Sequence, residues 1–163
     1  MHKKQMKSAA LGGEYIVAKI VASTTIERPT DEVWSFMLDA SNMPKWIPGF
    51  LEEKVTSAGP IGMGTTLQVK NSAWPHLVEF RITEYEPGRK STMEVASPSM
   101  MKGSRETFAL ENAEGKTKLS LTMDMKLNGI YSLLGPFVGR SLRKGGETEV
   151  RNLKRTLESG IKS

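Results

Sequence analysis

Residues 137–161 read FVGRSLRKGGETEVRNLKRTLESGI, and their apolar side chains recur at spacings of three, four and eight. Such spacings place side chains in one stripe along a helix. The stripe consists of Val138, Leu142, Val150, Leu153, Leu157 and Ile161. The opposite face carries Arg140, Arg143, Lys144, Glu147, Arg151, Lys154, Arg155 and Glu158, so we expect it to face water. A helix with one apolar side must pack on another element, and the preceding sequence can supply a sheet.

Two glycines, Gly145 and Gly146, interrupt this stripe where a further large apolar residue belongs. Each costs roughly 1 kcal/mol of helix propensity relative to alanine. One interpretation is a very close contact between helix and sheet, or a kink. The other is a space left open, with the glycines forming the floor of a ligand cavity. The sequence is compatible with both.

Most of the chain before this helix alternates between apolar and polar residues, which is typical of β-strands. We expect strands at residues 15–26, 50–57, 65–73, 77–85, 90–96, 103–111 and 116–127. Two short helices are expected after the first strand, within residues 30–49. Short polar turns between consecutive strands favour an antiparallel meander, and helices on one face of it give an α+β fold.

The composition limits the chemistry that the protein can perform. A chain of 163 residues with 38% hydrophobic and 25% charged residues is typical of one globular domain. The absence of cysteine excludes disulfides, thiolate nucleophiles and cysteine metal sites. Only His2 and His76 could supply imidazole. We therefore predict no metal site and no cofactor.

The net charge of +5 is concentrated at the two ends of the chain. Residues 1–13 hold three lysines and no acid, and residues 140–163 hold seven basic against three acidic residues. This pattern is more typical of a tail and a solvated helix face than of a nucleic-acid interface. No run approaches the about 18 apolar residues that span a bilayer. We expect residues 1–13 to be a disordered leader, residues 14–163 to be the domain, and the location to be cytoplasmic, with no stable membrane insertion and no nucleic-acid partner.

Polar residues on faces that should be buried are candidate site residues, because burying a polar group without a partner costs about 1 to 3 kcal/mol. The strand registers place five such residues inward: Thr24, Asn71, Ser91, Ser104 and Glu106. If Glu106 is buried away from a cation its pKa should rise, which suits a general acid or base, or a contact to a ligand hydroxyl. The alternative is a carboxylate at the cavity mouth or paired with an arginine. His76 follows Trp74-Pro75 between two strands and is a weaker candidate at a cavity rim.

Several segments resemble one known family. They are IERPTDEVW at residues 26–34, NMPKWIPG at 42–49, Gly64-Thr65, EYEPG at 84–88 and the closing helix. Over residues 15–161 the chain is similar to the polyketide cyclase/dehydrase and lipid-transport family of the START-like, helix-grip superfamily. The resemblance implies a seven-stranded curved antiparallel sheet around the long C-terminal helix, with a mostly apolar cavity between them. It implies no fixed catalytic motif.

The resemblance and the inward faces together predict binding of a small hydrophobic ligand, such as a lipid, a quinone or a polyketide-like molecule. The ligand-binding residues predicted are Thr24, Leu67, Val69, Asn71, Phe80, Met93, Val95, Phe108, Met123, Met125, Leu142 and Gly146. One alternative is a polyketide cyclase or dehydratase in which Glu106 or His76 moves a proton. A second alternative is a co-chaperone-like or membrane-surface module that uses the basic outer face of the last helix. The sequence fixes neither the ligand nor the oligomeric state.

Overall fold

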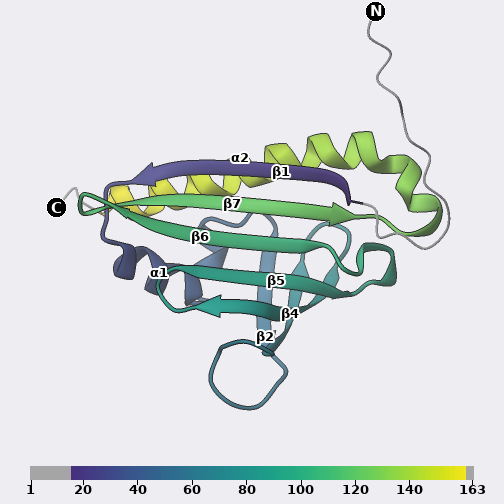
Figure 1. The fold of residues 1–163 in the computed structure, drawn as a ribbon, viewed down its shortest axis with the longest axis horizontal. Helices are drawn as coiled ribbons and strands as arrows, with labels where there is room; N and C mark the ends of the chain where they lie inside the picture. Colours follow the sequence, from purple (N-terminus) through teal and green to yellow (C-terminus); the bar gives the residue numbers. More distant parts are fainter. Residues whose placement is uncertain (1–15, 161–163) are drawn as a thin grey trace, which may run out of the picture.

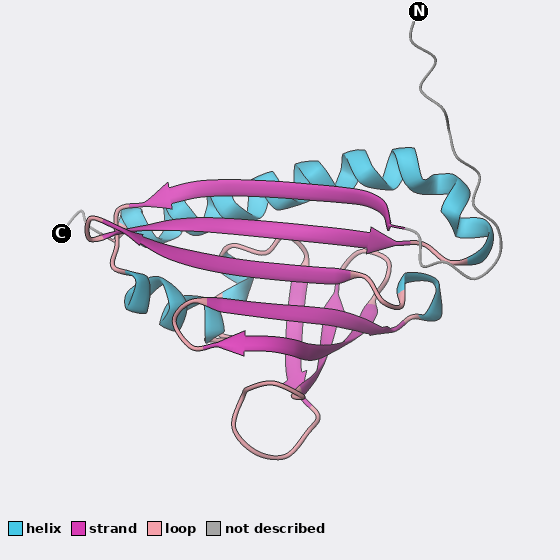
Figure 2. Cartoon of the chain, in the orientation of Figure 1, coloured by secondary structure: helices cyan, strands magenta, loops and turns pink. Residues whose placement is uncertain are grey.

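A computed structural model describes residues 16–160 and contains a single seven-stranded antiparallel sheet (Figures 1 and 2). Its strands are β1 (Ile16–Ile26), β2 (Phe50–Val55), β3 (Thr66–Asn71), β4 (Leu77–Glu86), β5 (Lys90–Ser97), β6 (Arg105–Ala113) and β7 (Lys116–Lys126). Their order across the sheet is β1-β7-β6-β5-β4-β3-β2, so six consecutive strands form the predicted meander and β1 pairs with the last of them. The strand directions turn strongly from β1 to β2, which curves the sheet.

The helices lie on the concave side of this sheet. After β1 come α1 (Thr30–Leu38) and the 3-10 helix η1 (Met43–Lys45), and the 3-10 helices η2 (Ser99–Met101) and η3 (Gly129–Leu134) follow β5 and β7. The long helix α2 (Gly135–Ser159) packs mainly along β1 and also contacts β7 (Figure 1). This confirms the predicted α+β helix-grip fold, including two short helices after the first strand. No helix within residues 16–160 is long and apolar enough to cross a bilayer.

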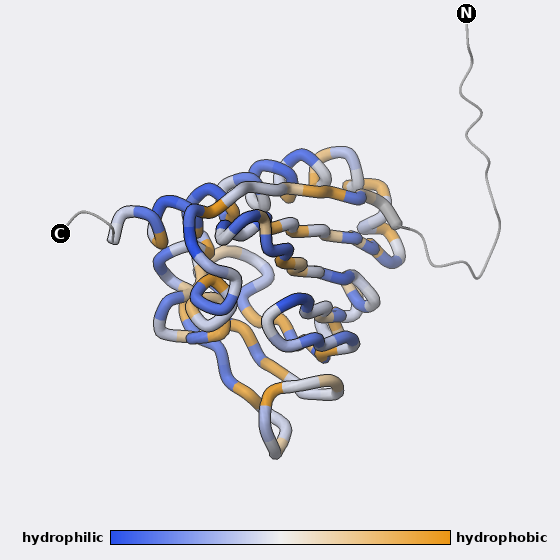
Figure 3. The backbone as a smooth tube through the Cα atoms, turned by 60° about the vertical axis from the view of Figure 1, so that its left-hand side comes forward, coloured by the Kyte–Doolittle hydropathy of each residue, from blue (hydrophilic) through white to orange (hydrophobic). Residues whose placement is uncertain are grey.

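The core forms where the apolar stripe of α2 meets the sheet. Val150, Leu153 and Leu157 are buried there, together with Leu119 and Leu121 of β7. Figure 3 shows the underlying pattern, because short orange and blue stretches alternate along the strands and along α2. The predicted end of the stripe, Ile161, lies outside the described residues, as do the predicted leader at 1–13 and His2.

One of the two glycines of α2, Gly146, packs against the sheet. A Cβ placed on Gly146 would lie 3.5 Å from Met123 Cε and 3.6 Å from Leu121 Cδ2, which are ordinary van der Waals distances. Gly145 has no neighbour at this distance. Gly146 therefore contacts the sheet through Leu121 and Met123 of β7.

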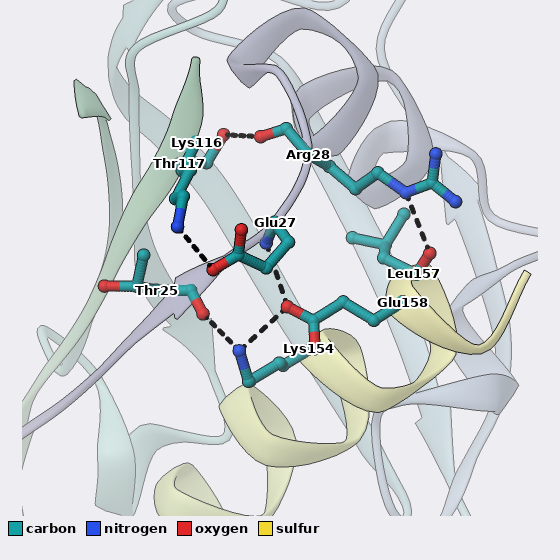
Figure 4. A network of polar contacts seen from close by, with 8 residues as sticks. All are labelled: Thr25, Glu27, Arg28, Lys116, Thr117, Lys154, Leu157 and Glu158. Atoms are coloured by element: carbon teal, nitrogen blue, oxygen red, sulfur yellow. Dashed lines mark hydrogen bonds and ion pairs between the residues drawn. The ribbon is translucent and has the colours of Figure 1, made fainter. Parts of the chain in front are cut away.

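Polar contacts fix the C-terminal end of α2 to the end of β1 (Figure 4). Lys154 Nζ donates to the carbonyl oxygen of Thr25 at 2.6 Å and contacts Glu158 Oε1 at 2.8 Å. The same Glu158 oxygen accepts the backbone N–H of Glu27 at 2.9 Å, and Arg28 Nε donates to the Leu157 carbonyl at 3.1 Å. Part of the charged helix face that we expected in water therefore contacts β1 instead.

Candidate functional site

A cavity of about 310 Å³ lies between the concave face of the sheet and the helices. Strands β2 to β7 form one wall, while α1, η1 and the segment that follows η1 form much of the opposite wall. Helix α2 contributes two side chains, Leu142 and Glu149. The cavity therefore lies nearer to α1 than predicted, because α2 is in direct contact with β1 and β7 over the rest of its length.

Most of the predicted site residues line this cavity. Their positions follow from the alternation of the strands, since one face of β3 to β7 points toward the cavity. The predicted residues in its walls are Leu67, Val69, Asn71, Phe80, Met93, Val95, Glu106, Phe108, Met123, Met125 and Leu142. Met37, which lies on α1, joins the three methionines of this set. The cavity surface is consequently apolar and flexible, which suits ligands of varied shape.

Three predicted site residues lie elsewhere. Thr24 lies on β1 and faces a shallow hollow beside Val150 and Lys154, because α2 covers the inward face of this edge strand. Gly146 is buried against Met123 and does not line the cavity. His76 is exposed in the turn between β3 and β4, with Nδ1 3.4 Å from the carbonyl oxygen of Asn71. None of the three residues lies in the wall of this cavity.

One cavity residue that the sequence analysis missed is Glu149. It lies on α2 seven residues after Leu142 and four before Leu153, so it belongs to the apolar stripe and not to the charged face. This position of a carboxylate among apolar residues could have identified Glu149 as a candidate site residue from the sequence. Glu149 lies in the cavity wall together with Glu106 of β6.

Glu106 and Glu149 are both partly buried, and the cavity reaches both side chains. Burial raises the pKa of Glu106 to about 7. Burial, and to a smaller extent the charge of Glu106, raises the pKa of Glu149 to about 8. Within residues 16–160 neither carboxyl has a hydrogen-bond or ion-pair partner. The pair is therefore a poorly solvated acidic site in an apolar cavity.

The other polar groups of the cavity differ from this pair because several have partners. Ser104 Oγ donates to the Lys126 carbonyl at 3.1 Å and accepts the Lys126 N–H at 2.9 Å. Asn71 Nδ2 donates to the Pro75 carbonyl at 3.3 Å. Trp46 Nε1 is buried and has no partner within the described residues. No group of three or more metal-binding side chains exists within residues 16–160.

The geometry thus defines a class of protein, a helix-grip domain with an apolar cavity whose wall includes the carboxyls of Glu106 and Glu149. Residues 17–158 match the family described as polyketide cyclase / dehydrase and lipid transport. The chain belongs to this family, and its predicted membership is confirmed. No curated protein matches the sequence.

Solved structures with the same fold have low sequence identity to this chain. XoxI from Bacillus cereus is 12% identical with a TM-score of 0.71, and the alignment covers 90% of this chain and 99% of that one. The di-domain ARO/CYC protein BexL from the BE-7585A biosynthetic pathway is 15% identical with a TM-score of 0.71, covering 89% and 48% of the two chains. The Aha1 dimer from Colwellia psychrerythraea is 17% identical with a TM-score of 0.62, covering 88% and 98%. These similarities concern the fold.

Proposed function

We propose that the protein binds a small, largely apolar molecule, such as a lipid, a quinone or a polyketide-like compound, in the cavity between sheet and helices. The observation that carries the proposal is the cavity itself, whose volume of about 310 Å³ is at the lower end of the range for small-molecule sites, roughly 300 to 1,000 Å³. Its family, which includes lipid transport in its description, supports the same function.

The proposed mechanism is non-covalent. Each 100 Å² of apolar ligand surface that leaves water contributes about 2.5 kcal/mol. The methionines at positions 93, 123 and 125 can adjust to the shape of the ligand. Polar groups in the wall would then orient the bound molecule.

Side chains that fill the cavity should weaken the binding of an apolar ligand. Met93→Trp on β5 and Leu142→Trp on α2 each place an indole in the cavity, from opposite walls. We expect each substitution to weaken binding of an apolar ligand about tenfold or more, because the ligand and the indole compete for one volume. A panel of apolar ligands is first screened by the shift in melting temperature of the protein. Calorimetry then measures the affinity of each ligand that binds.

The matched control is Val21→Trp, because Val21 is 61% exposed on β1 and lies outside the cavity walls. It should bind ligand like the unchanged protein. Equal affinity of all three tryptophan variants, or no response of the unchanged protein to any apolar ligand, would contradict the proposed function.

A second candidate function is catalysis of a cyclisation or dehydration. The observation that favours it is Glu106, whose pKa of about 7 suits proton transfer at neutral pH. If the protein turns over a polyketone, Glu106→Gln should lower kcat about 100-fold, whereas His76→Ala should leave kcat unchanged because His76 is exposed outside the cavity. A pH–rate profile that is the same before and after Glu106→Gln would contradict this role.

A further inference from the structure

We propose that the ligand of this cavity carries a basic nitrogen, which binds between the carboxyls of Glu106 and Glu149. This inference rests on the proposed function and adds the chemical class of the ligand. It concerns an apolar molecule, aromatic or branched alkyl, with one amine that is cationic at neutral pH.

The two carboxyls come from different elements on facing parts of the cavity. Glu106 lies in β6 between Met93 of β5 and Met123 of β7 in the strand register. Glu149 lies on α2, one turn before Leu153 and two turns after Leu142. Both residues are in the cavity wall, and their carboxyls are near enough to interact electrostatically. A ligand in the cavity therefore meets both carboxyls and the methionines beside them.

Within residues 16–160 no cation pairs with these carboxyls. The other ionisable residues in the cavity wall are Glu53, Arg105 and Asp124. Arg105 Nε donates to Glu94 Oε2 at 2.8 Å, and Asp124 Oδ1 lies 3.6 Å from Lys19 Nζ. No positive charge contributes to the pKa of Glu106 or Glu149, whereas burial raises the pKa of Glu53 as well. The wall thus carries four carboxyls and one guanidinium, and that guanidinium pairs with Glu94 outside the wall, in a protein that is basic overall.

A ligand with an amine accounts for the presence of two carboxyls in the cavity wall better than a neutral ligand does. A ligand carbonyl or hydroxyl needs one hydrogen-bond donor or acceptor, and Ser91 in the same wall offers a hydroxyl for this purpose. With a neutral ligand at least one carboxyl of the pair stays protonated at pH 7, and a second carboxyl is not needed to orient a single ligand oxygen. An ammonium group has several N–H donors that both carboxyl groups can accept, and its charge favours their ionised forms. Binding should therefore release protons from the pair.

Two probes of nearly equal shape test the inference, namely 2-(2-naphthyl)ethylamine and 2-(2-naphthyl)ethanol. At pH 7 we expect the amine to bind at least about tenfold more tightly, because ion pairs with little solvent are stronger than neutral hydrogen bonds. Calorimetry in two buffers of different ionisation enthalpy should show proton release with the amine and none with the alcohol. The double substitution Glu106→Gln and Glu149→Gln should remove both the preference and the proton release, so that the affinities for amine and alcohol agree within about threefold.

Matched controls are available on the same elements. Glu111→Gln lies on β6 and Glu147→Gln on α2, and both side chains are exposed outside the cavity. This double control should keep the preference for the amine. Equal affinities for amine and alcohol would overturn the proposed ligand class and leave the cavity-binding function standing. If neither probe binds, the proposed ligand class is also overturned. The panel of apolar ligands measured on the tryptophan variants then tests separately whether the cavity binds apolar molecules.

Discussion

Replacing Leu153 by alanine should lower the free energy of unfolding by about 3 kcal/mol, since Leu-to-Ala changes in cores cost roughly 2 to 5 kcal/mol. Leu153 is fully buried in the part of α2 that packs on the sheet. The substitution removes apolar surface and leaves a void that a helix held by Val150 and Leu157 cannot close. Urea unfolding followed by circular dichroism measures the effect.

The matched control is Leu133→Ala in η3, where the leucine side chain is 80% exposed. This substitution should change the free energy of unfolding by no more than about 0.5 kcal/mol. If both substitutions shift the urea midpoint equally, the contact between α2 and the sheet does not determine the stability of the domain.

The elements that the sequence predicted best are those with one buried and one exposed face. In β7, Leu119 and Leu121 are buried while Lys118 is exposed, and this alternation placed the strand to within one residue. The α2 stripe was predicted for the same reason. The helix η1 was shorter than the helix expected there, because the chain turns directly after Lys45.

The candidate site was predicted less completely, because it depends on how distant segments pack. Periodicity indicates that Thr24 points inward, but only the tertiary structure shows that α2 covers it. The pair Gly145-Gly146 is compatible with a helix that borders a cavity and with a helix that packs on a sheet, so the sequence alone did not distinguish these arrangements. Glu149 appears in the sequence as one more charge in a charged helix, and its meaning depends on Glu106, 43 positions earlier.

The carboxyl pair should also make the stability of the protein depend on pH between about 5 and 9. Glu106 and Glu149 have pKa values of about 7 and about 8 in the folded state, above the ordinary value of 4.5. The folded state therefore binds their protons more tightly than the unfolded state. Their contribution is fully present below pH 4.5 and is lost as the pH rises through 7 and 8. One pKa unit corresponds to about 1.4 kcal/mol, so ionising the pair should cost at least about 3 kcal/mol.

The measurement compares urea unfolding at pH 5.5 and pH 9 for the unchanged protein and for the Glu106→Gln, Glu149→Gln double variant. Between pH 5.5 and pH 9 the free energy of unfolding of the unchanged protein should fall by about 3 kcal/mol more than that of this variant. Glu53, Asp124 and Arg105 also line the cavity and are present in both proteins. The double control Glu111→Gln, Glu147→Gln should follow the unchanged protein. Parallel pH profiles for all three proteins would show that the carboxyls are well solvated, because only poor solvation and mutual repulsion make the folded state retain their protons.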